Sequence, residues 1–183
     1  MYLHTLASGS TGNCLLFSHN GQHLLLDAGI SCRRITTALR ALDMEPQSLL
    51  GVCVTHEHTD HVSGLATLTK QYGLPVLTSP GTGRQLCYRI AAMEDLLSPL
   101  SPGGVTDLGP FHIAAFPTPH DAAQPMGFTV SAEGRTAAVV TDLGYVSDDV
   151  LDGILGADLV VCESNHDVEW LQAGPYPYFL KSR

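Results

Sequence analysis

Positive charge is scarce in this sequence, which has 9 Lys and Arg against 18 Asp and Glu and a formal net charge of -9 at pH 7. That balance excludes a protein that coats nucleic acid by bulk electrostatic attraction, although it leaves room for a local basic patch. Long apolar runs are lacking too. None approaches the roughly 20 residues that a membrane-spanning helix needs, and residues 1–5 lack the basic start of a secretory signal.

Cysteine is present without a recognisable pattern. The five cysteines are widely spaced, odd in number and contain no C-x-x-C pair, so we expect reduced, structural thiols and a cytoplasmic location. The 183 residues are 44% hydrophobic and 15% charged, which is typical of a globular chain rather than a disordered one. We therefore predict a single domain over residues 1–183 with a sizeable core.

Short strands alternate with helices along the whole chain, which predicts an α/β fold. Strands are predicted over residues 2–7, 14–19, 22–27, 51–54, 74–78, 111–116, 127–131, 136–141 and 158–162. Helices are predicted over residues 31–42, from the segment after residue 61 through about 72, over 83–93 and over 147–155. Asn20-Gly21 predicts a tight hairpin, and the Pro- and Gly-rich residues 98–110 predict a surface connection.

A dense cluster of metal-ligand side chains follows the apolar segment 51–54. Three imidazoles and a carboxylate occupy six residues, namely His56, His58, Asp60 and His61. On extended backbone, side chains two residues apart point the same way, so His56 and His58 can share one metal ion. Asp60 and His61 follow after the chain turns and can face a neighbouring position. The cluster therefore predicts ligands for two adjacent metal ions.

Other ligand-type residues recur directly after predicted strands. They are Asp27, His120, Asp142 and the segment 163–167. Taken singly, His120 is more typical of a polar strand end, and either aspartate of a turn or a helix cap. Because they recur in register with the histidine cluster, we expect the strand ends to converge at one edge of stacked sheets.

Mixed imidazole and carboxylate ligands indicate metal-assisted hydrolysis. Two cations about 3.5–4 Å apart can share a hydroxide and stabilise the attacking and leaving oxygens of a phosphate. We expect zinc because four histidines dominate the set, although manganese or iron suits the same ligands.

Further polar residues are candidates for substrate contact and proton transfer. Ser8, Ser10 and Asn13 lie in a glycine-containing loop that can contact a phosphate, although a tight turn explains the loop equally well. Beside Asp60, the candidate catalytic residues are Glu163 and His166, with His166 donating a proton to the leaving group and Glu163 orienting it. A hydrogen-bonded strand end explains that last pair equally well.

The segment His56-x-His58-x-Asp60-His61 resembles the signature of the metallo-β-lactamase fold superfamily. Asp27, His120 and Asp142 follow in the order of its other metal-site motifs. Within the superfamily, four segments resemble the YycJ/WalJ branch, namely residues 6–14, 141–145, 163–167 and 174–181. The resemblance implies an αβ/βα four-layer sandwich with its metals at one edge. It also implies a phosphodiesterase acting on nucleic acid, specifically a 5′→3′ exonuclease with DNA as substrate.

Carried over to this sequence, the resemblance implies one role for each matching residue. The first metal is held by His56, His58 and His120, the second by Asp60 and His61, with Asp142 bridging both and Asp27 orienting a ligand imidazole. The branch continues with a Gly-His-Leu-Ser-Asn-like motif that does not occur before Arg183. We therefore expect the last elements of the fold to be missing and the second metal to bind more weakly than the first.

Three alternatives remain open. A glyoxalase-II-like thioesterase shares the ligands but carries a C-terminal substrate-binding extension. A secreted zinc β-lactamase needs a signal peptide and usually has Cys at the position of Asp142. A metal-binding but catalytically inactive domain is the third. If DNA is the substrate, the basic residues available to contact a single strand are Arg33, Arg34, Arg40 and Lys70.

Overall fold

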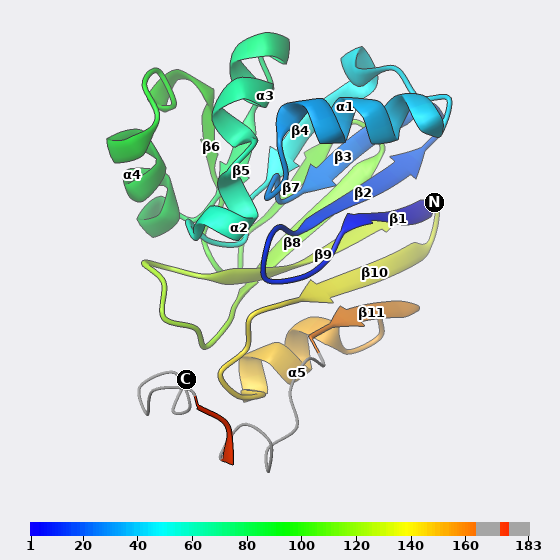
Figure 1. Ribbon diagram of the computed structural model, residues 1–183. Helices are drawn as coiled ribbons and strands as arrows, with labels where there is room; N and C mark the ends of the chain where they lie inside the picture. Colours follow the sequence, from blue (N-terminus) through cyan, green and yellow to red (C-terminus); the bar gives the residue numbers. More distant parts are fainter. Residues whose placement is uncertain (164–172, 176–183) are drawn as a thin grey trace.

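Two mixed β-sheets form the centre of the computed structural model, which describes residues 1–163 and 173–175 (Figure 1). The first sheet has the order β1-β2-β3-β4-β5-β6, with bounds Tyr2–Ala7, Cys14–His19, Gln22–Leu26, Leu49–Cys53, Val76–Thr78 and Leu97–Pro99. The second sheet has the order β11-β10-β9-β8-β7, and β7 to β11 span Val105–Leu108, Phe111–Pro117, Met126–Ala132, Arg135–Val140 and Leu159–Cys162. Antiparallel and parallel pairs occur in both sheets.

Helices cover the outer faces of the two sheets. The α-helices are α1 Cys32–Ala41, α2 Thr59–Val62, α3 Leu65–Tyr72, α4 Pro80–Arg89 and α5 Asp148–Ile154, and short 3₁₀ turns occur at Pro46–Ser48 and Glu94–Leu96. In Figure 1, α1, α3 and α4 lie on the side of the first sheet, and α5 lies on the far side of the second. Among residues 1–163 and 173–175, no helix is long and apolar enough to cross a membrane.

The buried side chains separate into three clusters that define four layers. On β2 and β3, Leu16 and Leu25 pack toward α1, where Ile35 and Leu39 are buried. Their neighbours Leu15, Phe17, Leu24 and Leu26 point to the opposite face and pack against Ile113, Phe128 and Val130 of the second sheet. A third cluster joins α5 to the second sheet through Val150, Phe116 and Val140. This alternation, with a period of two residues, confirms the predicted αβ/βα sandwich.

The hairpin predicted at Asn20-Gly21 connects β2 and β3. Its residues have φ angles of 49° and 73°, and His19 pairs with Gln22 across the turn. Positive φ at both central positions is the conformation that the right-handed twist of two antiparallel strands requires, and Asn-Gly adopts it readily.

The prediction of a surface connection over residues 98–110 was wrong. Part of β6 and all of β7 lie in this segment, and each is an edge strand of its sheet. Pro99 is the last residue of β6, where its missing N–H group costs no internal ladder bond. Proline and glycine therefore obscured two strands that are short and paired on one side only.

Two predicted helices have different bounds in the structure. The helix predicted over residues 83–93 is α4, which begins at Pro80, and the Ser79 hydroxyl accepts from the Thr82 N–H at 3.1 Å. The single helix predicted up to Tyr72 is instead α2 and α3, separated at Gly64. A Cβ at Gly64 would lie 2.0 Å from the carbonyl oxygen of Ile30, so the chain approaches its neighbour too closely there for any other residue.

Candidate metal centre

The predicted ligand residues gather where strands of both sheets end. The loop after β4 and helix α2 bring His56, His58 and His61, the loop after β8 brings His120, and Asp142 comes two residues after β10. A cavity of about 470 Å³ adjoins these loops and is lined by residues of both sheets, among them Ser8, Ser10, Asn13, Asp60, Asp142 and Glu163. The expected convergence of strand ends at one edge is what the structure has.

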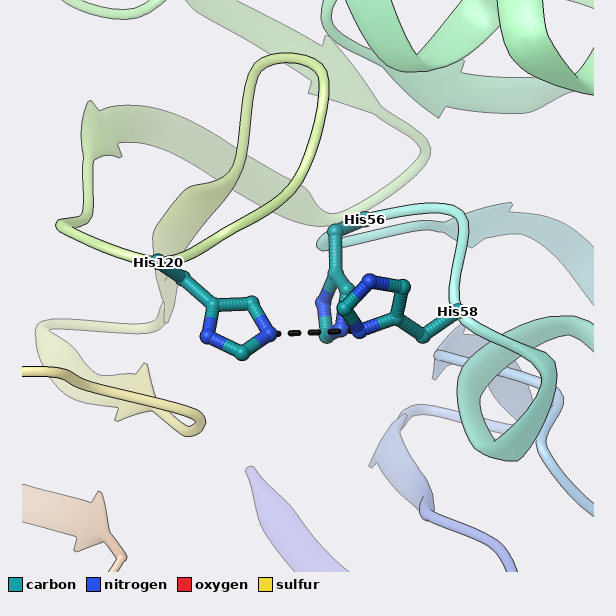
Figure 2. A group of neighbouring side chains, drawn as sticks. All are labelled: His56, His58 and His120. Carbon is teal, nitrogen blue, oxygen red and sulfur yellow. Dashed lines mark hydrogen bonds between the residues drawn. The ribbon is translucent and has the colours of Figure 1, made fainter. Parts of the chain in front are cut away.

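His56, His58 and His120 form one group whose ligand nitrogens all lie within 4.8 Å of one another. The His120 Nε2 and His58 Nδ1 atoms are 3.2 Å apart, and the three rings point toward a common centre (Figure 2). The ring centroids of His56 and His120 are 4.7 Å apart, with the planes at 78°. Three imidazoles with converging nitrogens can hold a divalent cation.

A second group within the same distance limit contains His56, His61 and Asp142. The His61 Nε2 atom is 3.0 Å from Asp142 Oδ2. Asp60 lies beside this group, with Oδ2 at 3.6 Å from the same nitrogen of His61. Both groups combine ligands from the first and the second sheet.

Asp27 and Thr55 orient His61 and His56 by hydrogen bonds to their Nδ1 atoms. The Asp27 carboxylate is 2.7 Å from His61 Nδ1, and it accepts hydrogen bonds from the N–H group of Thr55 at 2.9 Å and from its hydroxyl. Because the hydroxyl proton of Thr55 goes to Asp27, its oxygen is left to accept from His56 Nδ1 at 3.0 Å. This assignment leaves the Nε2 lone pair of His56 directed into the site, while Nε2 of His61 faces the Asp142 carboxylate.

The surroundings of the His56 Nε2 atom indicate whether a cation fits the site. This atom is buried and has no hydrogen-bond partner among the described residues. Burial, together with the nearby His61, lowers the pKa of His56 to about 2, so its imidazole is neutral and carries a free lone pair. A buried polar atom without a partner is costly in a folded protein. A metal ion would satisfy it, and the residues present therefore fit a cation.

The carboxylates supply the negative charge that a cation requires. Burial lowers the pKa of His61, but Asp27 and Asp142 outweigh that effect and raise it to about 10. Burial likewise opposes the charge of Asp142, yet its hydrogen bond to His61 lowers the pKa of this carboxyl to about 2. Asp142 is thus ionised at neutral pH and faces the imidazole nitrogens.

The loop predicted to contact phosphate is attached to the ligand groups through Asn13. Its Oδ1 atom accepts from the N–H group of Gly9 at 3.0 Å, while its Nδ2 atom lies 3.1 Å from His61 Nε2. Asn13 therefore holds the loop against the histidines. Ser8 and Ser10 line the cavity and remain available for contact with a substrate.

The other predicted catalytic pair is only partly described. Glu163 accepts from the N–H group of Leu143 at 3.1 Å, so its carboxylate supports the loop that carries Asp142. His166 lies outside the described residues. Thr55 and Glu57 were not predicted as site residues, and both contact the ligand loops through hydrogen bonds. The alternation of side chains between His56 and His58 was the one signal that could have directed attention to Glu57.

The fold and the histidine groups define a protein of the metallo-β-lactamase type, and comparison with known proteins agrees. The family model described as "Beta-lactamase superfamily domain" matches residues 22–175, and the chain belongs to this superfamily. It is similar to exodeoxyribonuclease YycJ of Bacillus anthracis, with 38% identity over 184 residues that span 100% of this chain and 70% of the relative. It is also similar to exodeoxyribonuclease WalJ of Streptococcus pneumoniae, with 33% identity over 97% of this chain and 67% of the relative.

Solved structures support the same fold. Zn(2+)-bound PqqB from Methylobacterium extorquens matches with a TM-score of 0.71 and 22% identity, covering 91% of this chain and 65% of that one. The metallo-beta-lactamase SMB-1 matches with a TM-score of 0.69 and 18% identity, covering 87% of this chain and 76% of that one. At these identities the likeness concerns the fold alone. The predicted superfamily and its YycJ/WalJ-like branch are confirmed by the family model and the relatives together.

Proposed function

We propose that this chain is a metal-dependent phosphodiesterase that degrades DNA from the 5′ end, as a single domain over residues 1–183. One observation carries the proposal: two groups of ligand side chains adjoin a cavity of about 470 Å³ that is open to a substrate. Relatives named as exodeoxyribonucleases, which match along nearly the whole chain, support DNA as the substrate. A cytoplasmic location is part of the proposal and is supported by five cysteines without disulfides.

The proposal gives the ligands the following roles. His56 belongs to both groups, but Thr55 occupies its Nδ1 atom, so its Nε2 atom can serve only one ion. We assign it to the first ion with His58 and His120, and we assign the second ion to His61, Asp142 and the adjacent Asp60. When bound, two divalent cations, zinc by preference, supply Lewis acidity to a phosphodiester and to the attacking water.

Protein groups bind and orient the DNA strand in this proposal. Ser8 and Ser10 face the cavity and can donate hydroxyl hydrogen bonds to a phosphate. A separate groove of about 450 Å³ is lined by Ile30, Arg33 and Arg34 among others. Loop and groove are adjacent, since a Cβ at Gly12 would lie 2.7 Å from the Ile30 side chain.

The two arginines form the basic contact that an acidic chain needs to bind a strand. Both are exposed on α1, and no ion pair is found for either within residues 1–163 and 173–175. Lys70 lies on α3 and lines a different cavity. We expect a variant carrying Arg33→Ala and Arg34→Ala to bind single-stranded DNA more weakly and with less salt dependence, while Lys70→Ala changes neither.

The direct test is degradation of an end-protected oligonucleotide. With Zn²⁺ or Mn²⁺, phosphorothioate linkages at the 5′ end should prevent release of nucleotides, whereas the same linkages at the 3′ end should not. His58→Ala should abolish release, and His112→Ala, an exposed histidine paired with Asp107, should leave it unchanged. Hydrolysis of S-lactoylglutathione without loss of DNA would instead support the thioesterase. Bound metal without turnover of either substrate would support an inactive metal-binding domain.

A further inference from the structure

Glu57 is a buried carboxylate located between two proposed metal ligands, His56 and His58, yet its hydrogen bonds go to other parts of the chain. The side chain is directed toward α4 and the β8–β9 loop. Its Oε1 atom accepts from the N–H group of Ala123 at 2.8 Å, and its Oε2 atom accepts from the Thr82 hydroxyl at 3.3 Å. Both oxygens are thus satisfied by segments far from it in sequence. Burying a carboxylate is costly unless it is hydrogen-bonded, so these contacts explain how the charge is accommodated.

The loop that Glu57 holds is the loop that carries His120. Ala123 follows His120 by three residues, and the next residue, Gln124, rests on the start of α4. The Ser79 hydroxyl donates to the Gln124 carbonyl at 2.6 Å, and the Gly81 N–H donates to Gln124 Oε1 at 2.8 Å. A Cβ at Gly81 would lie 2.5 Å from Gln124 Cβ, so this close approach requires glycine.

Helix α4 holds Glu57 from both of its ends. The Thr82 hydroxyl in the first turn is shared between the Glu57 carboxylate and the Gln124 carbonyl oxygen, each at 3.3 Å. Arg89 in the last turn donates from Nη1 to the Glu57 carbonyl oxygen at 2.9 Å. The helix therefore fixes the segment with His56 and His58 and the loop with His120 relative to one another. Glu57 belongs to the segment with His56 and His58, and its side chain contacts both α4 and the loop with His120.

We propose that Glu57 is a positioning residue, which fixes His120 relative to His56 and His58 so that the first cation site is formed before the cation arrives. The proposal rests on the proposed function only in taking these three histidines as ligands. Hydrogen-bonding partners that orient metal ligands typically contribute about 10–100-fold to metal affinity. The carboxylate acts through the backbone of the His120 loop rather than on the cation or the substrate.

The test is titration of the metal-free protein with Co²⁺, followed by visible absorption. Glu57→Ala removes both acceptors and should weaken binding of the first ion by about tenfold or more. Glu57→Gln keeps the side-chain shape and an oxygen that can accept from Ala123, so it should restore affinity to within about threefold of the original. Glu94→Ala, an exposed glutamate in the 3₁₀ turn after α4, is the matched control and should have no effect.

A merely structural role would produce a different set of results. A positioning role leaves His120 able to bind the cation, so a high Co²⁺ concentration should restore the absorption spectrum and DNA degradation of Glu57→Ala. A merely structural role should leave both low at any Co²⁺ concentration. If Glu57→Ala does not fold, Thr82→Val, which removes only the hydroxyl donor, should still weaken Co²⁺ binding without lowering the unfolding temperature to the same degree. Unchanged Co²⁺ affinity in the folded variants would overturn the proposal, as would equal losses in the Gln and Ala variants.

The outcome also separates this inference from the proposed function. Tight Co²⁺ binding that depends on Glu57, in a protein that does not degrade DNA, would refute the nuclease and support the positioning role. Absence of Co²⁺ binding by the unmodified protein would refute both. DNA degradation with a Co²⁺ affinity that is independent of Glu57 would refute the positioning role alone.

Discussion

The two sheets contribute to the candidate metal centre in different ways. Asp27 and His61, which follow strands of the first sheet, are buried, with side chains that are 2% and 0% exposed. The loops of the second sheet are more open, since the His120 and Asp142 side chains are 13% and 27% exposed. The first half is fixed by internal hydrogen bonds, and the second half is positioned against it.

Backbone contacts explain why the first half is so tightly held. Asn13 donates its N–H to the Asp60 carbonyl at 2.7 Å, and Gly29 donates to the Asn13 carbonyl at 2.8 Å. Three separate loops are therefore joined directly through their main chains. The second sheet supplies one ligand to each group, so a bound cation would connect the two sheets. Cation binding and overall stability should be coupled for this reason.

Gly29→Ala tests the hydrogen-bonded loops of the first sheet and should have the largest effect on stability. A Cβ at this position would lie 1.7 Å from the Asp60 carbonyl oxygen and 2.6 Å from the Asn13 nitrogen, both of which are backbone atoms. We expect a loss of more than about 4 kcal/mol in the free energy of unfolding, or failure to fold. Gly83→Ala is the control, because its nearest atom is a flexible Leu97 methyl at 3.2 Å, and it should be close to neutral in urea unfolding. Equal behaviour of the two variants would contradict this account.

Cation binding tests the connection between the halves. At a free Zn²⁺ concentration 100 times the Kd, the native state should gain about 2.7 kcal/mol, which corresponds to a rise of roughly 5–10 °C in the unfolding temperature of a chain of this size. His58→Ala should lose this rise and His112→Ala should keep it, as measured by calorimetry with and without a chelator. A rise that persists in His58→Ala would mean that Zn²⁺ binds elsewhere.

The two cations should differ in affinity. The first site has three imidazoles, whereas the second has one, from His61, and relies otherwise on Asp142 and on Asp60, whose side chain is 30% exposed. Exposed carboxylates interact with a cation through water of high dielectric constant, so we expect the second ion to bind about tenfold more weakly or worse, a difference of about 1.4 kcal/mol. Isothermal titration should resolve two steps, with Asp60→Asn lowering only the weaker one. Two equal steps would show that some other group completes the second site.

Much of the first half of the site could be predicted from the sequence because its chemistry is local. His56, His58 and His61 lie within six residues after an apolar strand, and strand geometry alone aligns the first two. The positions of Asp27, His120 and Asp142 follow from the rule that strand ends meet at one sheet edge. The predicted strands and helices indicated only an α/β fold, and the four layers followed from the resemblance of the histidine motif to the metallo-β-lactamase signature.

The remainder depends on tertiary contacts that no local pattern encodes. The contact of Asn13 with phosphate stays a prediction, but no local pattern indicated that its amide connects the Gly9 backbone to His61. The proposed role of Glu57 depends on Thr82 and Ala123, which are 25 and 66 residues away in sequence. β6 and β7 were missed because short edge strands tolerate the proline and glycine that normally indicate loops.

The smallest predicted effect concerns the reactivity of cysteine thiols, which should differ between the first and the second sheet. Cys14 and Cys53 are 0% exposed in the first sheet, and burial, with Asp27 nearby, raises the pKa of both thiols. Cys162 is exposed on β11, the edge strand of the second sheet. With DTNB at pH 8, Cys162 should react within minutes, whereas Cys14 and Cys53 should react only as fast as the first sheet opens.

Mass spectrometry of the labelled protein would identify each site, and Cys162→Ser should remove the fast phase alone. The slow phase should become slower still with Zn²⁺ present, because a cation that connects the two sheets also opposes opening of the first. Modification of Cys53 as rapidly as Cys162 would show that the first sheet opens easily. The internal hydrogen bonds of the first sheet and its loops would then not be sufficient to keep it closed without a bound cation.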